Sequence, residues 1–205
     1  MPRHIDYYFS TISPWSFMGH APFMAIAERH GASVGFHPVS MGPIFAESGG
    51  LPLPQRAPQR QRYRLLELQR WRVKRGIDFH IHPAHWPFDP ALADKTVVAA
   101  GADAPRLLPG LYAGVWQHQR DLADPATIAE IADAAGLPGA ELVAAAASEA
   151  VAEIYLANRT KALAADVFGA PSYVLDGEVF WGQDRLELLD DALASGRDPF
   201  RPIPA

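Results

Sequence analysis

The N-terminal segment alternates between a strand pattern, a helix pattern and a second strand pattern. Residues 5–9 (IDYYF) and 34–39 (VGFHPV) are rich in aromatic and β-branched residues, which is typical of short buried strands. Between them, apolar residues recur at helical spacing from Phe17 to Ala27, and Gly31 suits the position after a helix end. A strand, a helix and a strand in this order pack as a parallel unit with a right-handed crossover. The pattern therefore predicts an α/β protein.

The C-terminal segment returns to a sheet pattern. Asp176-Gly177 separates two short strand-like runs, SYVL and EVFW, and this dipeptide strongly favours a hairpin turn. Residues 184–193 then place Leu186, Leu189 and Leu193 along one face of a helix. We therefore predict two antiparallel strands followed by one amphipathic helix.

The middle of the chain is dominated by helical patterns. Glycine and proline punctuate residues 41–58, which we expect to form a loop. Residues 60–75 predict a strongly basic helix, whereas residues 79–90 (FHIHPAHWPFDP) predict irregular structure. Residues 92–165 are rich in alanine and leucine and predict several helices, one of them capped by Asp124.

The order of these elements predicts a thioredoxin-like fold with a helical domain inserted in the middle of the chain. On this interpretation residues 1–41 and 166–205 form the thioredoxin-like domain, and residues 42–165 form the inserted helical lobe. A chain of 205 residues is long enough for this arrangement.

Composition narrows the classes of function. The formal net charge of -5 disfavours nucleic acid and anionic membranes as partners. The chain has no cysteine, which excludes disulfide exchange, zinc–thiolate sites and a protein thiol nucleophile. No apolar run is long enough to span a membrane, and the N-terminus lacks the apolar core of a secretory signal. A cytoplasmic location is the resulting expectation.

The segment Ser13-Pro14-Trp15-Ser16 admits two interpretations. Serine is a favoured helix N-cap and proline a favoured first helical residue, so the pair can simply mark a helix start. In a thioredoxin-like unit, however, this helix begins at the sheet edge where ligands bind, and redox members carry Cys-x-x-Cys there. A serine at this place has no redox chemistry, but its hydroxyl can donate a hydrogen bond to the thiolate of a bound ligand.

Three further motifs accompany this segment in order along nearly the whole chain. They are Tyr63, Glu67, Arg70 and Trp71 on the basic helix, VFGAPS at 167–172, and FWGQDR at 180–185. Together with SPWSF at 13–17 they resemble the 2-hydroxychromene-2-carboxylate isomerases, relatives of the kappa-class glutathione transferases in the DsbA-like thioredoxin superfamily. Ser10 and Thr11 depart from the family pattern, which has an acidic and an aromatic residue there, and Gly49-Gly50 stands where many relatives carry asparagine.

The resemblance implies glutathione as cofactor and Ser13 as the catalytic residue that holds its sulfur. It also implies a cis peptide at Ala170-Pro171, with the backbone of Ala170 pairing with the cysteinyl unit. From the residues alone, a trans proline that opens a strand is the ordinary alternative. The cofactor-binding residues expected on this basis are Pro14, Arg60, Ala170, Pro171, Gln183 and Asp184.

Two of these residues have simpler interpretations as well. Gln183 and Asp184 stand where the family holds the γ-glutamyl end of glutathione, but Asp184 is equally explained as a helix cap. Arg60 lies near where relatives carry lysine and suits a carboxylate of glutathione or substrate. It also belongs to a closely packed group of basic residues, most of which we expect to be solvated surface charges.

The loop at 79–90 is expected to cover the ligand cleft, with Trp15, His85 and Trp86 lining the substrate pocket. Plain surface packing is the alternative for this loop. His80, His82 and His85 lie close together in sequence, and three imidazoles can bind zinc, but we expect no metal because no supporting residues are apparent.

The leading hypothesis is glutathione-dependent isomerisation of 2-hydroxychromene-2-carboxylate-like aromatic catabolites by reversible thiolate addition. A kappa-like glutathione S-transferase, in which the adduct is released, is one alternative. A non-catalytic thioredoxin-fold binding module, in which the two serines mark a decayed redox site, is another. A small aromatic substrate, a homodimer, and the absence of nucleic-acid and membrane partners complete the expectations.

Overall fold

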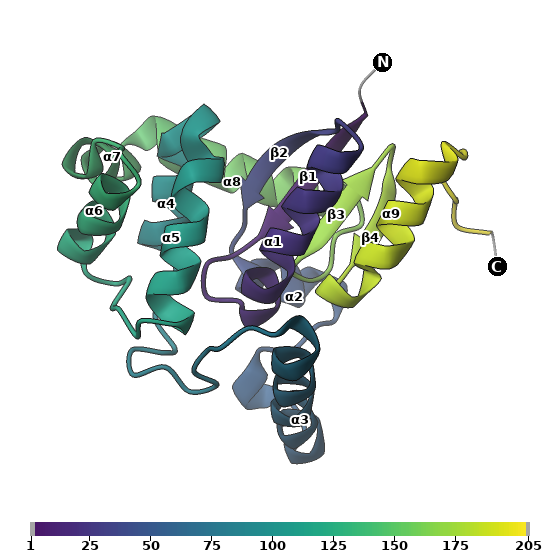
Figure 1. The fold of residues 1–205 in the computed structure, drawn as a ribbon, viewed down its shortest axis with the longest axis horizontal. Helices are drawn as coiled ribbons and strands as arrows, with labels where there is room; N and C mark the ends of the chain where they lie inside the picture. The colour runs from purple at the N-terminus through teal and green to yellow at the C-terminus, as the bar shows by residue number, and fades with distance from the viewer. Residues whose placement is uncertain (1–2, 204–205) are drawn as a thin grey trace.

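The computed structural model describes residues 3–203, which form one central sheet and helices around it (Figure 1). The sheet has four strands in the order β2-β1-β3-β4. Their bounds are β1 His4–Phe9, β2 Ser33–Pro38, β3 Ser172–Leu175 and β4 Glu178–Trp181. The first and last segments of the chain thus build the sheet together, as the sequence pattern predicts.

The register confirms the predicted pairing of strands. β1 and β2 are parallel, with Tyr7 opposite Phe36, and β1 and β3 are antiparallel, with Tyr8 opposite Ser172. β3 and β4 form the hairpin predicted at Asp176-Gly177. Asp176 and Gly177 both have positive φ angles, which is the backbone conformation that such a two-residue turn requires.

Helices α1 (Pro14–Arg29) and α9 (Leu186–Ser195) lie side by side on one face of the sheet (Figure 1). Between α1 and the sheet is a buried aromatic cluster. The ring of Tyr7 stacks on Tyr173 at a centroid distance of 5.3 Å, and Phe23 lies 4.5 Å from Tyr173. Such pairs contribute about 0.5–1.5 kcal/mol each beyond their buried area. They fix α1 against the strand that leads into it.

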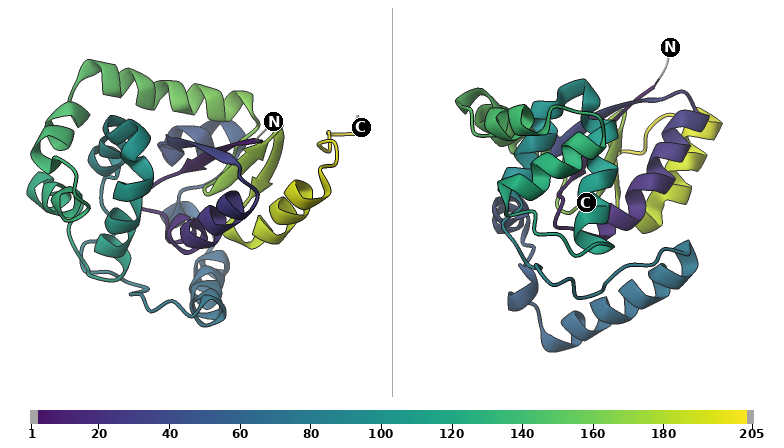
Figure 2. Two further views of the ribbon diagram at one scale, coloured as in Figure 1. Left: turned by 45° about the horizontal axis from the view of Figure 1, so that its top comes forward. Right: turned by 60° about the vertical axis from the view of Figure 1, so that its left-hand side comes forward.

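The remaining helices form the segment between β2 and β3. α6 and α7 lie at the end of the molecule furthest from β4, α4 and α5 lie nearer the sheet, and α8 runs back to it (Figures 1 and 2). The bounds are α2 Met41–Ser48, α3 Pro58–Arg75, α4 Ala91–Ala100, α5 Ala104–Trp116, α6 Pro125–Ala134, α7 Gly139–Ala146 and α8 Glu149–Ala164. The helical insertion is therefore confirmed, while the domain limits at residues 41/42 and 165/166 stay a prediction.

One prediction about this segment is wrong. Residues 41–58 were expected to be a loop, but Met41–Ser48 form helix α2 and Leu53–Gln55 form a 3-10 turn, η1. Proline is tolerated in the first turn of a helix, where its missing N–H is not needed, so Pro43 does not break α2. Gly49 ends the helix in the left-handed conformation. The glycine and proline residues mark helix ends here instead of a loop.

The other predicted elements agree with the structure within a few residues. Helix α6 begins after Asp124, whose carboxylate accepts from Ala126 N and Thr127 N as a cap. Residues 79–90 form turns and bends, as expected. In residues 3–203 no helix combines the length with the apolar character that crossing a membrane requires.

Candidate active site

Ser13 is the N-cap of α1 and is held in place by its own backbone and side chain. Its Oγ accepts a hydrogen bond from Ser16 N at 3.2 Å, and its N–H donates to Ser10 O at 3.1 Å. The side chain is half-buried, and the first turn of α1 contains no acidic residue. The positive end of the helix dipole is therefore not compensated locally. The Ser13 hydroxyl hydrogen is not used in the cap, so this group can donate to an anionic ligand atom.

The start of β3 reaches the same edge of the sheet as Ser13. Because Tyr8 pairs with Ser172 in an antiparallel register, the end of β1 and the residues just before β3 lie next to each other. The Ala170-Pro171 peptide is cis, as the resemblance implied. Pro171 is buried and its carbonyl accepts from Gly182 N at 2.8 Å, while Ala170 is partly exposed. Ala170 is thus a partly exposed residue beside the turn that carries Ser13.

Gln183 and Asp184 follow β4 in a 3-10 turn, η3 (Gln183–Arg185). Gln183 is buried, and Arg75 from the end of α3 donates to its Oε1 at 2.8 Å and to its carbonyl at 2.9 Å. Asp184 is exposed and pairs with Arg185 at 2.5 Å. In this structure the Gln183 side chain therefore ties α3 to the sheet domain, whereas the Asp184 carboxylate faces solvent.

Helix α3 brings a different arginine to the site from the one chosen in the sequence. Arg60 is exposed, whereas the guanidinium of Arg64, one turn further along, lies over the Trp86 ring at 5.3 Å. Burial lowers the pKa of Arg64 to about 10, with a smaller contribution from the charge of Arg56. Within residues 3–203 no carboxylate pairs with Arg64. A partly buried cation without an anionic partner is well suited to bind an anion.

The three residues predicted to line the substrate pocket fall in different places. Trp86 is half-buried, and its Nε1 donates to Ile12 O at 3.1 Å, directly before Ser13. Trp15 is also partly buried and packs against the core at the first turn of α1. His85 is exposed, and its Nδ1 lies 3.7 Å from a carboxylate oxygen of Asp121. Trp86 and Trp15 are therefore brought to the Ser13 turn, and His85 lies toward Asp121.

Asp94 lies on the buried face of α4 and is hydrogen-bonded to the turn before Ser13. Its carboxylate is fully buried and accepts from Ser10 Oγ, from Thr11 N and from Thr11 Oγ1, each at 2.8 Å. Tyr155 on α8 adds a fourth hydrogen bond at 3.2 Å. Burial raises the pKa of Asp94 to about 6. The sequence analysis did not identify this residue; the signal is a charge among apolar helix positions, between Ala93 and Val97.

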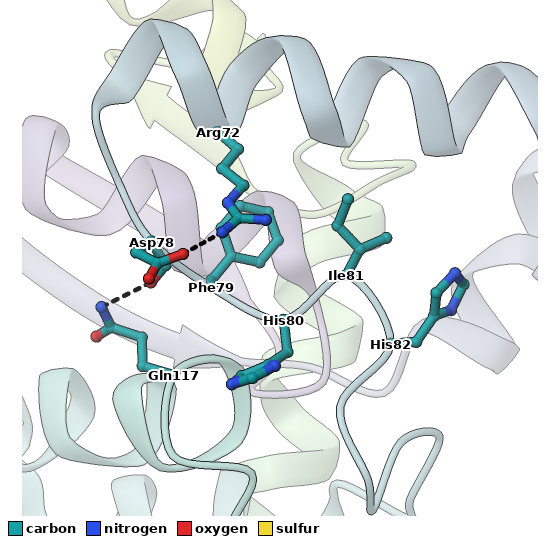
Figure 3. Close-up of a pocket in the computed structure, with 7 residues that line it drawn as sticks. All are labelled: Arg72, Asp78, Phe79, His80, Ile81, His82 and Gln117. Atoms are coloured by element: carbon teal, nitrogen blue, oxygen red, sulfur yellow. Dashed lines mark hydrogen bonds and ion pairs between the residues drawn. The ribbon is translucent and has the colours of Figure 1, made fainter.

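A hollow of about 370 Å³ lies between α3 and the loop before α4 (Figure 3). Arg72 reaches from α3 to Asp78 across this hollow, and Gln117 donates to the Asp78 carbonyl. None of the predicted site residues lines it. It adjoins α1 through Phe79, whose ring lies edge-on to Phe17 at 5.6 Å.

The histidines of this loop do not converge. His80 and His82 lie in irregular backbone, and their two rings point apart in Figure 3. Within the described part of the chain, no group of three or more histidine or carboxylate side chains is arranged to hold a metal ion.

Comparisons with known proteins agree with this architecture. The model of the DSBA-like thioredoxin domain matches residues 4–194. A 2-hydroxychromene-2-carboxylate isomerase of Sphingobium xenophagum is 28% identical over 94% of this chain and 99% of its own length. Glutathione S-transferase kappa 1 of Homo sapiens is 25% identical over 100% of this chain and 96% of its own. The solved structure of a 2-hydroxychromene-2-carboxylate isomerase, at 22% identity, superposes with a TM-score of 0.83 and covers 94% of this chain and 95% of that one.

A mixed sheet with an inserted helical segment, and a serine capping the helix after the first strand, define a thioredoxin-type domain without redox cysteines. The chain belongs to the DSBA-like thioredoxin domain family. The resemblance to hydroxychromene-carboxylate isomerases and kappa-class glutathione transferases is confirmed, and these relatives are enzymes by name.

Proposed function

We propose that this protein is a glutathione-dependent isomerase of 2-hydroxychromene-2-carboxylate-like aromatic compounds, with Ser13 as its catalytic residue. The observation that carries the proposal is the position of the Ser13 hydroxyl. It caps the uncompensated positive end of α1, at the sheet edge where the partly exposed Ala170 also lies. Bound glutathione supplies the thiolate that adds reversibly to a conjugated carbon of the substrate.

The Ser13 hydroxyl and the helix dipole are sufficient to keep a bound thiol ionised. A thiol with a pKa of about 8.5 is only about 3% ionised at pH 7, and lowering its pKa by roughly two units requires about 2.7 kcal/mol. One hydrogen bond to a charged acceptor contributes about 1.5–3 kcal/mol, and the N-terminal helix dipole adds about 0.3–1 kcal/mol. Because Ser13 is held by Ser10 and Ser16, its hydroxyl is positioned before the ligand arrives.

Other residues of the chain fit the remaining groups of glutathione. Pro14 is the first residue of α1 and has no backbone N–H of its own. Ala170 is partly exposed, and its backbone suits strand-like pairing with the cysteinyl unit of glutathione. The exposed carboxylate of Asp184 suits the γ-glutamyl ammonium group. Arg75 occupies only the Oε1 atom of Gln183, whereas the buried Nε2 has no hydrogen-bond partner among the described residues. This amide N–H and the backbone N–H groups of η3 are therefore the donors that suit the γ-glutamyl carboxylate.

The substrate carboxylate would be held by Arg64. This guanidinium lies on Trp86, and Trp86 is bonded to Ile12 beside the catalytic turn, so an anion bound by Arg64 lies near Ser13. The flat Trp86 ring, with Trp15 at the same turn, suits an aromatic substrate. Arg60, which is exposed, is left as a surface charge that attracts anions without orienting them.

Titration calorimetry with glutathione, followed by an isomerisation assay with 2-hydroxychromene-2-carboxylate, tests the proposal. We expect glutathione to bind and the isomerisation to depend on it. An absence of both heat and thermal stabilisation would refute the proposal and favour a non-catalytic binding module, which is the rival outside the enzyme classes.

Replacing Arg64 tests the substrate assignment, with Arg60 as its matched control on the same helix. Arg64→Leu is expected to raise the KM for the aromatic carboxylate at least about tenfold, because a charge-assisted hydrogen bond of about 1.5–3 kcal/mol is lost. Arg60→Leu should change this KM less than about twofold, since exposed charge pairs contribute little. Equal effects of the two substitutions would contradict a specific role for Arg64.

A kappa-like glutathione transferase remains the second candidate, favoured by the full-length similarity to the human kappa protein. Incubation with glutathione and an electrophilic aryl halide separates the two activities. A stable conjugate favours the transferase, whereas substrate isomerised without consumption of glutathione favours the isomerase. A homodimer and a cytoplasmic location stay predictions alongside either activity.

A further inference from the structure

The turn between β1 and α1 is anchored by a carboxylate from a different part of the chain. Ser10 and Thr11 lie between the last residue of β1 and Ser13, and together they donate three hydrogen bonds to Asp94, each of 2.8 Å. Asp94 and Tyr155, the fourth donor, both lie in the helical insertion. The insertion therefore holds the turn that carries the catalytic serine.

Ser10 connects Asp94 directly to Ser13. Its hydroxyl donates to Asp94, and its carbonyl accepts the N–H of Ser13 at 3.1 Å. The same serine thus contacts the carboxylate and the N-cap residue. Any change in how Asp94 holds Ser10 is transmitted to Ser13 through two hydrogen bonds.

We propose that Asp94 is a positioning residue, whose carboxylate fixes the turn from Ser10 to Ser13 and thereby the direction of the Ser13 hydroxyl. The catalytic role of Ser13 rests on the proposed function, whereas the anchoring of the turn by Asp94 does not. Asp94 is bonded to the turn and not to Ser13 itself, so it acts through Ser10 and Thr11 and is no acid or base in the reaction.

Among the residues that the structure describes, Asp94 accepts four hydrogen bonds and forms an ion pair with no cationic side chain. Tyr155 on α8 donates a hydrogen bond to Asp94. Burial and the charge of Asp94 raise the pKa of Tyr112 on α5, and burial and the charge of Asp89 raise the pKa of Tyr155. His37 on β2 is bonded to Asp6 and Asn158 instead. The titratable side chains on the other elements that pack against α4 are exposed or paired elsewhere: Glu141, Glu149, Glu153, Lys161, Arg159 and Asp103.

The protonation state of Asp94 therefore controls how firmly the turn is held. Burial raises its pKa to about 6, so the carboxylate is ionised at neutral pH and becomes protonated in mildly acidic solution. Hydrogen bonds to a charged acceptor are about twice as strong as those to a neutral one. In a local opening that breaks these bonds while Asp94 stays buried, protonation therefore weakens the hold on Ser10 and Thr11 without removing it. For complete unfolding, which exposes Asp94 to water, the sign is the opposite.

Amide hydrogen exchange on the ligand-free chain measures this coupling without any assay of activity. We expect the protection factors of the Thr11 and Ser13 N–H groups to fall about tenfold between pH 8 and pH 5, when corrected for the intrinsic rate. The Thr127 N–H, held by the exposed carboxylate of Asp124, is the matched control and should keep its protection. An unchanged Thr11 protection factor across this range would overturn the proposal.

Two variants assign the effect to Asp94. In Asp94→Asn, an isosteric change that keeps an acceptor for Thr11, the fall in protection should disappear. In Tyr155→Phe, loss of a donor that favours the ionised form should move the fall to higher pH. A profile in Asp94→Asn that matches the parent would also overturn the proposal.

The kinetic arm tests the connection to Ser13. Asp94→Asn should lower kcat severalfold at pH 8 while leaving the KM for glutathione within about twofold. The substitution changes the direction of the Ser13 hydroxyl but removes no contact with the ligand. An unchanged kcat would refute the positioning role. Should glutathione fail to bind the parent protein, the proposed function fails, while the exchange experiment still decides whether Asp94 holds the turn.

Discussion

Two aspartates in this chain, Asp94 and Asp124, each accept hydrogen bonds from the backbone N–H and the hydroxyl of one threonine. Asp94 holds Thr11 before α1, and Asp124 holds Thr127 in the first turn of α6. Asp94 is fully buried, and burial raises its pKa to about 6. Asp124 is exposed, and the hydrogen bond from Thr127 holds its pKa below the ordinary range.

The same hydrogen-bonding pattern therefore has opposite costs in the two regions. At α6 the Asp124 carboxylate is exposed to water, so its ionised form has little desolvation cost and its hydrogen bonds stabilise the fold. Beneath the Ser13 turn the ionised carboxylate is held without a cation, which costs folding free energy at neutral pH. A chain that keeps such a group beside its candidate site trades stability for a firmly held turn, as is common where function is located.

The largest contrast is expected between two serine caps, Ser13 at the start of α1 and Ser148 at the start of α8. Ser13 and Ser148 each cap a helix and accept from the N–H three residues on, at 3.2 and 3.3 Å. Ser13→Ala should lower kcat by about 100-fold or more, as removal of a donor to a developing or bound anion does elsewhere. Ser148→Ala should leave kcat within about twofold and cost about 1 kcal/mol of stability. Steady-state kinetics and urea unfolding measure both effects.

If Ser13→Ala and Ser148→Ala were equally active, Ser13 would be a structural cap only. If Ser13→Ala lost activity together with its fold, circular dichroism and the unfolding midpoint would reveal it.

A smaller contrast concerns stability at pH 7. Asp94→Ala should reduce the free energy of unfolding by about 3 kcal/mol, because four donors, including the buried Thr11 N–H, lose their acceptor. Asp124→Ala should cost less, since water replaces the carboxylate at an exposed cap. Chemical denaturation of the two variants beside the parent makes the measurement. A larger loss from Asp124→Ala would invert the comparison.

The smallest expected effect is on the pH dependence of stability. The pKa of Asp94 is raised to about 6 in the folded state, so its contribution to stability is greatest in acid and is lost as the pH rises through 6. Relative to the parent, Asp94→Asn should therefore gain on the order of 1 kcal/mol between pH 5 and pH 7.5. The lowered pKa of Asp124 has the opposite sign: its stabilisation is complete above the ordinary aspartate pKa and is lost only in stronger acid.

Unfolding curves of parent, Asp94→Asn and Asp124→Asn at these two pH values test this: Asp94→Asn should gain relative to the parent, whereas Asp124→Asn should keep a constant difference from it. A constant difference between Asp94→Asn and the parent would mean that Asp94 does not titrate in this range.

Much of the fold could be predicted from the sequence because the patterns that indicate its elements are local. The aromatic run of β1, the Ser13-Pro14 helix start and the Asp176-Gly177 hairpin each depend on a few adjacent residues. Helix α2 was missed because Pro43 and Gly49 are residue types that favour a loop, although in the structure they occupy the first turn and the C-cap. The same residue types mark a loop or the two ends of a short helix, and only packing decides between them.

The candidate site was readable only where a motif carried it. The role of Ser13 and the cis Ala170-Pro171 peptide were implied by the family resemblance of short motifs, whereas Asp94 and Arg64 act through contacts with residues far away in sequence. Arg64 resembles its basic neighbours until the loop at 79–90 places Trp86 beneath it. A charged residue among the apolar positions of α4 is the one sequence signal that could have indicated Asp94, and its burial became known only from the structure.

Gly19 gives the arrangement around α1 a further consequence. A β-carbon at this position would lie 2.7 Å from Cβ of Gln183 and 2.8 Å from the hydroxyl of Tyr173. The first helix and the segment after β4 thus touch with no side chain between them, at a separation set by atomic radii alone. Random mutagenesis should accordingly find Gly19 nearly irreplaceable, because every other side chain would have to displace Gln183 or Tyr173.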